Sequence, residues 1–249
     1  MTIQSDEFGH PHRLHDFDGV LSSLHFLLLD MAELLKYQLE QSMHALDFAD
    51  ADVALKVISR DRKVHHFQNK IDDEAMAVLA RYTPVANDLR TVVSSIKIAV
   101  ELAKIGQNIR DFAELVTVLY DPNTSDPNQK LLADIIKSAG LINIMLNKVM
   151  TVLEAWDSKQ AYELLQCDRE CESDLQEGIK HQLALILKDA RMIKRALDIM
   201  EMLKALEYCG EHCKHIAEYS IFMIDGTDIR HDRETPIVDV YINPLDAII

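Results

Sequence analysis

The stretch GVLSSLHFLLLDMAELLKYQLEQSMHALDF, which spans residues 19–48, decides the fold class. Its apolar side chains recur at steps of three and four residues, so they form one stripe along a helix. The stripe consists of Leu24, Leu27, Leu28, Met31, Leu35, Leu39, Met43 and Leu46. A long helix with one apolar face is stable when other helices cover that face, so this stretch predicts an all-α bundle.

Five further segments carry the same helical pattern. The chain has only 7 Gly and 6 Pro in 249 residues, and most of them fall between the periodic segments. We expect these helices over residues 51–82, 84–120, 128–156, 158–188 and 190–224. Pro84 suits the first turn of a helix, where its missing N–H is not needed.

The two halves of the chain resemble each other. The segment DPNTSDPNQ at residues 121–129 is rich in turn-forming residues and divides the chain nearly in half. IGQNIRDFAE at residues 105–114 aligns with CGEHCKHIAE at residues 209–218, and Asp61-Arg62 matches Asp168-Arg169 with a small shift in offset. We therefore predict one three-helix unit over residues 17–120, a linker over 121–127 and a second three-helix unit over 128–225.

Shorter segments flank these units at both ends. Residues 1–16 form a predicted polar tail, in which His10, His12 and His15 could capture a metal ion, although their spacing defines no geometry. Residues 226–249 form a predicted C-terminal extension. Within it, residues 236–243 alternate apolar and polar side chains, as an extended segment does. That segment either docks against the bundle or a second subunit, or is a disordered tail.

Charge and composition exclude several classes of protein. The chain has 41 acidic and 26 basic residues and a formal net charge of −15, so it lacks the positive charge of a nucleic-acid binder. No stretch approaches the roughly 18 consecutive apolar residues of a membrane span, and the N-terminus lacks the features of a secretory signal. Together with only four cysteines, this predicts a cytoplasmic protein.

Three motifs resemble the PhoU family, whose members regulate bacterial phosphate uptake. LARYTPVANDLR at residues 79–90 resembles the family's LARxxPVAxDLR turn between its second and third helices. LEYCGEH at residues 206–212 resembles LERIGDHA, and FMIDGTDIRH at residues 222–231 resembles YLVxGTDxRH. The motifs occur in the family's order, and the resemblance covers roughly residues 17–231, including the duplication.

The resemblance implies a metal site on the last helix of the second repeat. The family's E/D-x-x-x-D motif falls on Glu207 and Glu211, with Glu in place of the final Asp, and Glu218 extends the same stripe. A four-residue step places two carboxylates on one helical face, so their oxygens can converge on a hard cation, either a divalent ion or iron. The first repeat has Ala103 and Gln107 instead, so we expect its metal site to be lost.

An alternative interpretation of this acidic pair stays open. Acidic pairs at this spacing are common on solvated helix faces, where Lys204 and Lys214 would neutralise the pair. Asp168 and Glu172 form another pair at the same spacing. We expect them to be a solvated face, with helper ligands as the alternative role.

The four cysteines form two pairs at helical spacing, Cys167 with Cys171 and Cys209 with Cys213. If the last two helices form a hairpin, the pairs lie at the same height, and four thiols could bind zinc or an iron–sulfur cluster, or cross-link on oxidation. The first repeat has the apolar residues Val64, Ile105 and Ile109 at matching positions, which favours buried core thiols. Because the acidic pair lies about 160° around the helix from Cys209, no mixed site is expected.

We interpret the chain as an all-α adaptor that acts by binding and is not an enzyme. It has no P-loop, dinucleotide-binding turn or nucleophile motif, and its single Glu-x-x-His, Glu7 to His10, is a weak indication of a di-iron site.

The resemblance implies a negative regulator that contacts the ATPase of the phosphate ABC transporter and the phosphate sensor histidine kinase, and that forms a homodimer. A relative serving a low-affinity phosphate transporter is a variant of this interpretation. The alternative from another class is a metal- or redox-responsive helical sensor that uses Glu207 and Glu211 or the four cysteines.

Overall fold

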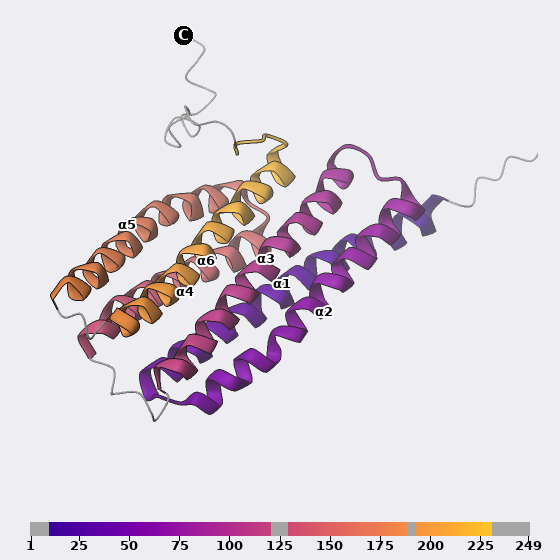
Figure 1. Cartoon of the computed structure of the whole chain (residues 1–249). Helices are drawn as coiled ribbons and strands as arrows, with labels where there is room; N and C mark the ends of the chain where they lie inside the picture. Colours follow the sequence, from indigo (N-terminus) through magenta and orange to yellow (C-terminus); the bar gives the residue numbers. More distant parts are fainter. Residues whose placement is uncertain (1–9, 121–128, 189–192, 231–249) are drawn as a thin grey trace, which may run out of the picture.

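A computed structural model describes residues 10–120, 129–188 and 193–230 (Figure 1). Within these ranges the chain forms six long helices and no strand, which confirms the all-α prediction. The helices are α1 (His10–Phe48), α2 (Ala51–Tyr82), α3 (Ala86–Leu119), α4 (Gln129–Ala155), α5 (Ser158–Lys188) and α6 (Ile193–Asp225). Helices α1 to α3 form one group and α4 to α6 the other.

Two helix starts differ from the sequence expectation. Helix α1 begins at His10, inside the segment predicted to be a tail. Helix α3 begins at Ala86, and Pro84 lies before it in a turn where Thr83 and Ala86 both have positive φ angles. The predicted linker at 121–127 and the alternating segment at 236–243 lie outside the described residues.

The predicted stripe of α1 is the core of the first repeat. Six of its eight members are at most 1% exposed, and only Leu27 and Met43 are partly buried. Helices α2 and α3 both pack against α1, and α2 starts at a capping bond in which Asp50 accepts from the N–H of Val53 at 3.1 Å. Burying this stripe supplies the driving force that holds the three helices together.

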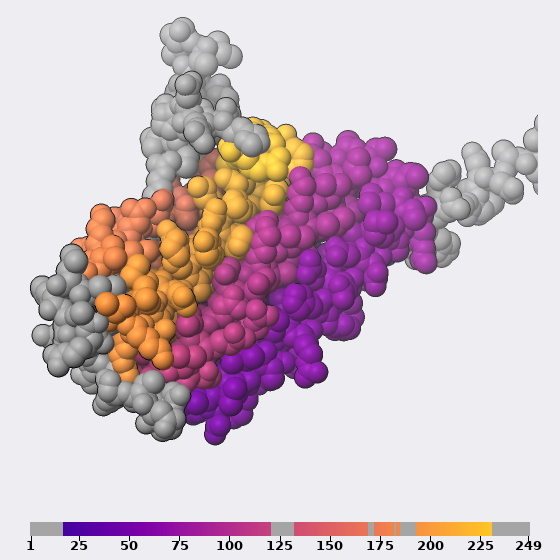
Figure 2. All heavy atoms as spheres, viewed as in Figure 1, coloured from indigo at the N-terminus to yellow at the C-terminus, as the bar shows by residue number. Residues whose placement is uncertain are grey.

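The two repeats are joined mainly by α3 and α6, which have the most extensive interface in the molecule. Lys97 lies over the ring of Tyr219, and further along α3 the thiol of Cys209 donates to the carbonyl of Ile105 at 3.9 Å. Residues later in α3 therefore contact residues earlier in α6, so the two helices are antiparallel. Figure 2 shows them side by side along one face of the molecule.

Ile105 and Cys209 are matching positions of the two repeats, so their contact places an approximate twofold axis between α3 and α6. An ion pair repeats on the two sides of this axis. Arg110 of α3 lies 3.4 Å from Asp61 of α2, and Lys214 of α6 lies 3.9 Å from Asp168 of α5. The structure thus supports the duplication seen in the sequence.

One segment of α4, Leu132–Ala155, is long and apolar enough to cross a membrane by length and composition, within the described ranges. In this bundle, 44% of the tested window is buried. Ile135, Ile142 and Met145 have no exposed surface, because α4 packs against α1, α5 and α6. Core helices of bundles pass the same test, so the segment is a weak indication of a membrane span.

Two of the sequence motifs meet at the end of α6. Gly226 has a φ of +75°, a conformation that favours glycine, and its N–H donates to the carbonyl of Phe222 at 3.0 Å. A Cβ atom at Gly226 would lie 2.9 Å from Nη1 of Arg90, which belongs to the motif at residues 79–90. Beyond it, Arg230 pairs with Asp228. The GTD segment therefore packs against the start of α3.

Replacing Gly106 by Ala is expected to destabilise the first repeat. The added Cβ would lie 2.9 Å from Cγ1 of Val64 and 3.0 Å from Cδ2 of Leu35, so overpacking outweighs the helix propensity that Ala adds. We expect a loss of about 1 kcal/mol in the free energy of unfolding, measured by urea denaturation. Gly140→Ala is the control: nothing lies within 4 Å of its Cβ, so it should gain stability. Equal effects of the two substitutions would contradict the packing described here.

Candidate functional site

A pocket of about 300 Å³ lies between α5 and α6 and brings both predicted acidic pairs together. Helix α5 supplies Asp168 and Glu172, and α6 supplies Glu207 and Glu211. Each pair lies on one face of its helix because its members are four residues apart. The charged lining also includes Lys204 and Lys214. Four carboxylates and two ammonium groups therefore share one pocket.

The four carboxylates differ in exposure. Glu172 and Glu211 are exposed, as expected of a solvated face, and Glu207 is half-buried. Asp168 departs from that expectation, because only 14% of its side chain is exposed. Burial raises the pKa of Asp168, and the charges of Glu172 and Glu211 raise it further, against the opposing effect of Lys214. The pocket thus carries negative charge that its own lysines neutralise only in part.

The lysines lie at the edge of hydrogen-bonding range. Nζ of Lys204 is 3.8 Å from Oε2 of Glu207, and Nζ of Lys214 is 3.9 Å from Oδ2 of Asp168. Both lysine side chains are about half exposed and make no close contact with these carboxylates, so a cation can displace them. Glu218 lies two turns beyond Glu211 on α6 and does not line the pocket. Burial raises the pKa of Glu218 as well.

The matching region of the first repeat lacks most of these carboxylates. The residues of the first repeat that match Asp168 and Glu172 are Asp61 and His65. Oδ2 of Asp61 lies 3.5 Å from Nε2 of His65. Ala103 is buried and Gln107 is exposed on α3. A single carboxylate therefore stands where the second repeat has four. The loss of the first metal site stays a prediction.

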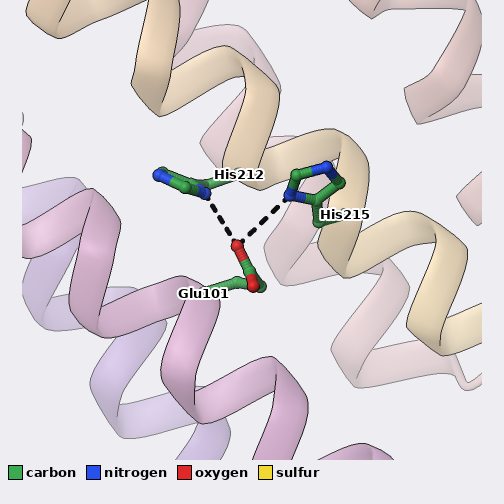
Figure 3. A group of neighbouring side chains, drawn as sticks. All are labelled: Glu101, His212 and His215. Carbon is green, nitrogen blue, oxygen red and sulfur yellow. Dashed lines mark hydrogen bonds and ion pairs between the residues drawn. The ribbon is translucent and has the colours of Figure 1, made fainter.

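A second group of polar side chains lies between the repeats (Figure 3). Oε2 of Glu101 on α3 is 2.7 Å from Nδ1 of His212 and 3.3 Å from Nδ1 of His215, both on α6. Oε1 of Glu101 accepts from Lys104 at 3.0 Å. Glu101, His212 and His215 each offer one atom that could bind a metal ion. In the described part of the chain, these three atoms all lie within 4.8 Å of one another.

The electrostatics of this group follow from its contacts. Burial alone would raise the pKa of Glu101, but hydrogen bonds from His212, His215 and Lys104 hold it well below its usual range. The hydrogen bond to Glu101 raises the pKa of His215, and burial opposes this. The carboxylate is therefore ionised at neutral pH and attracts positive charge from both helices.

Comparisons with known proteins match the fold and the motifs. A family model described as the PhoU domain matches residues 28–116 and 135–220, which together exceed half of the chain. The chain belongs to the PhoU family. Both matched segments lie within the helical repeats of the structure, which confirms the resemblance identified from the motifs.

Matches to known relatives cover most of both chains. A phosphate-specific transport system accessory protein PhoU homolog of Pseudomonas aeruginosa is 27% identical over 92% of this chain and 93% of its own length. The accessory protein PhoU of Escherichia coli is 26% identical over 88% of this chain and 90% of its own. The crystal structure of PhoU from P. aeruginosa superposes with a TM-score of 0.78 at 26% identity, covering 85% of this chain and all of that one.

Within this PhoU-family fold, none of the three cysteines whose side chains the structure describes lines the acidic pocket. Cys209 and Cys213 are buried, Cys167 is half-buried, and the side chain of Cys171 lies outside the described part of the chain. The thiol of Cys209 points at α3 rather than at α5, and burial raises its pKa. Cys209 and the exposed Glu211 lie on opposite sides of α6, as their angular separation predicts. A thiol site that unites all four cysteines stays a prediction.

The pairing of His215 with Glu101 predicts a pH dependence of stability. The pKa of His215 is raised above its ordinary 6.5, so the pair stabilises the fold fully below pH 6.5 and loses this contribution as the pH rises through the raised value. In histidine NMR titrations, Glu101→Gln should return the pKa of His215 toward 6.5. The thermal stability of the variant should also vary less between pH 6 and 8. An unchanged His215 titration in Glu101→Gln would contradict the ion pair.

Proposed function

We propose that this PhoU-family protein is an accessory regulator of a phosphate-specific transport system. The observation that supports this most is the extent of the match: the P. aeruginosa accessory protein aligns over 93% of its length with both repeats of this chain. The regulator works in the cytoplasm, where the nucleotide-binding subunit of an ABC transporter lies.

In this proposal the chain is an adaptor that acts by binding. It contacts the ATPase of the phosphate ABC transporter and the phosphate sensor histidine kinase, and it restrains both when phosphate is ample. Its net charge of −15 favours association with basic surfaces on those partners and speeds their encounter. The long exposed faces of α3 and α6 offer rigid surfaces for such contacts (Figure 2). A homodimer would present each surface twice.

The acidic pocket is the proposed metal site of this regulator. Glu207 and Glu211, helped by Asp168 and Glu172, would hold a divalent cation or iron through carboxylate oxygens, which such hard ions prefer. The bound cation would offset the effects that raise the pKa of Asp168, which are first its burial and then the charges of Glu172 and Glu211. Charge at the pocket would then depend on the metal, which gives the adaptor a means to change its affinity for a partner.

A thiol-based sensor is less well supported by the geometry. A redox-sensing cysteine needs thiolate character and access to solvent, whereas Cys209 is buried with a raised pKa. The metal-responsive alternative uses the same acidic pocket as the adaptor. The adaptor and the metal-responsive sensor differ only in whether partner binding requires the metal.

Direct binding assays test the adaptor proposal. The purified chain should bind the transporter ATPase and the cytoplasmic part of the sensor kinase in biolayer interferometry. Deleting its gene should raise expression of a phosphate-starvation reporter in phosphate-rich medium, and the intact gene should restore repression. Absence of binding to both partners, together with an unchanged reporter in the deletion strain, would refute the adaptor.

Removing the acidic pair should release metal from the pocket. Glu207→Gln/Glu211→Gln eliminates two of the four carboxylates, so its metal content by inductively coupled plasma mass spectrometry should fall by about one equivalent relative to the native protein. Glu201→Gln is the matched control, because Glu201 is exposed on α6 outside the pocket. If the double variant keeps the native metal content, the pocket is a solvated face and not a metal site.

A further inference from the structure

Glu101, His212 and His215 form a group that the acidic pocket does not include. Glu101 lies on α3 in the first repeat, and the two histidines lie three residues apart on α6 in the second. Figure 3 shows one nitrogen of each imidazole aimed at the same carboxylate oxygen. We propose that these three side chains bind a transition-metal ion of the Zn²⁺ class and that the ion fastens the two repeats together.

The ligand set has the composition of a zinc site. Imidazole nitrogen and carboxylate oxygen are ordinary Zn²⁺ ligands, and two histidines with one glutamate leave a fourth position for water or another ligand. The pocket between α5 and α6 differs in kind, because it offers only carboxylates and suits harder ions. The two sites would therefore differ in which metals they prefer.

The distances require little rearrangement. Tetrahedral Zn²⁺ with bonds of about 2.0–2.1 Å has ligand atoms about 3.3 Å apart. Nδ1 of His215 already lies 3.3 Å from Oε2 of Glu101, and Nδ1 of His212 lies 2.7 Å from it. The second distance must open by about 0.6 Å. The third separation, between the ligand nitrogens of His212 and His215, is within 4.8 Å.

The surroundings prepare the site for a cation. The Glu101 side chain is only 6% exposed, so its negative charge is poorly screened by water. Lys104 occupies the other carboxylate oxygen, Oε1, and its side chain is 47% exposed, so it can stay there or withdraw. His215 is 35% exposed, which leaves an open side for entry of the ion and for the fourth ligand.

Metal binding exchanges protons for the ion. Because a carboxylate can only accept, each Nδ1 now carries the hydrogen that points at Glu101. Binding requires both Nδ1 atoms unprotonated, so a neutral ring adopts its Nε2–H tautomer and a cationic ring releases one proton. Each Nδ1–H bond breaks as the bond from Nδ1 to the metal forms. In a neutral ring the proton moves through solvent to Nε2, and in a cationic ring, whose Nε2 is already protonated, it leaves to solvent.

Comparison of the two repeats shows that this group of ligands occurs on only one side of the approximate twofold axis. Across the approximate twofold axis, the positions matching Glu101, His212 and His215 hold Ala205, Asn108 and Asp111. Two of the three ligand types are missing there. Asp111 is therefore a natural control position, on α3 and part-exposed like His215.

Cobalt binding tests the proposal, with Co²⁺ as a spectroscopic substitute for Zn²⁺. The full chain, without an affinity tag and with His10, His12 and His15 replaced by Asn, is stripped with chelator and titrated with Co²⁺. We expect the visible bands of a four-coordinate ion at one equivalent, abolished by Zn²⁺. Glu101→Gln and His215→Gln should each weaken binding by at least about 10-fold, since even outer residues that orient metal ligands have effects of that size.

Matched variants separate this site from the acidic pocket. Asp111→Asn and Glu207→Gln/Glu211→Gln should keep the four-coordinate Co²⁺ spectrum, and circular dichroism checks the folding of every variant. The proposal is overturned if the parent protein gives no four-coordinate spectrum, or if Glu101→Gln and His215→Gln bind Co²⁺ as tightly as the parent. These readouts do not involve phosphate or partner proteins, so they stand whether or not the adaptor proposal succeeds.

Discussion

Antiparallel packing of α3 against α6 is the constraint on which the rest of the molecule depends. The matching positions Ile105 and Cys209 touch at its centre, where the thiol meets a backbone carbonyl. Beside them, Gly106 and Gly210 permit close approach to the other helices of their own repeats. Because this register is fixed, Glu101 meets two histidines of the other repeat, and the outer faces of both helices stay open to solvent.

The two repeats have nearly the same framework, but the charged residues placed on it differ. Both repeats keep an ion pair between their second and third helices, from Arg110 to Asp61 and from Lys214 to Asp168. Around that shared pair, only the second repeat has a set of carboxylates able to hold a hard cation. The core is made of apolar stripes, so the charged residues around it can differ between the repeats while the shared framework stays the same.

The sequence predicted the features that depend on local spacing. The stripe at residues 19–48 predicted the helical core, and four-residue steps predicted which face Glu207 and Glu211 share. Features that depend on packing between distant helices were not predictable in this way. The burial of Asp168 arises from α6 crossing over α5, and Glu101 is 111 residues from His212 in the chain. The only sequence signal for that group was a pair of histidines three residues apart, which alone does not define a site.

The central claim is that metal chemistry belongs to the second repeat and to the junction between repeats, and is absent from the matching region of the first. An anomalous difference map from crystals grown with Co²⁺ tests it most directly. We predict one peak beside Glu207 and Glu211 and another among Glu101, His212 and His215, with none beside Ala103 and Gln107. A peak at Ala103 and Gln107, or density at neither predicted position, would contradict this account.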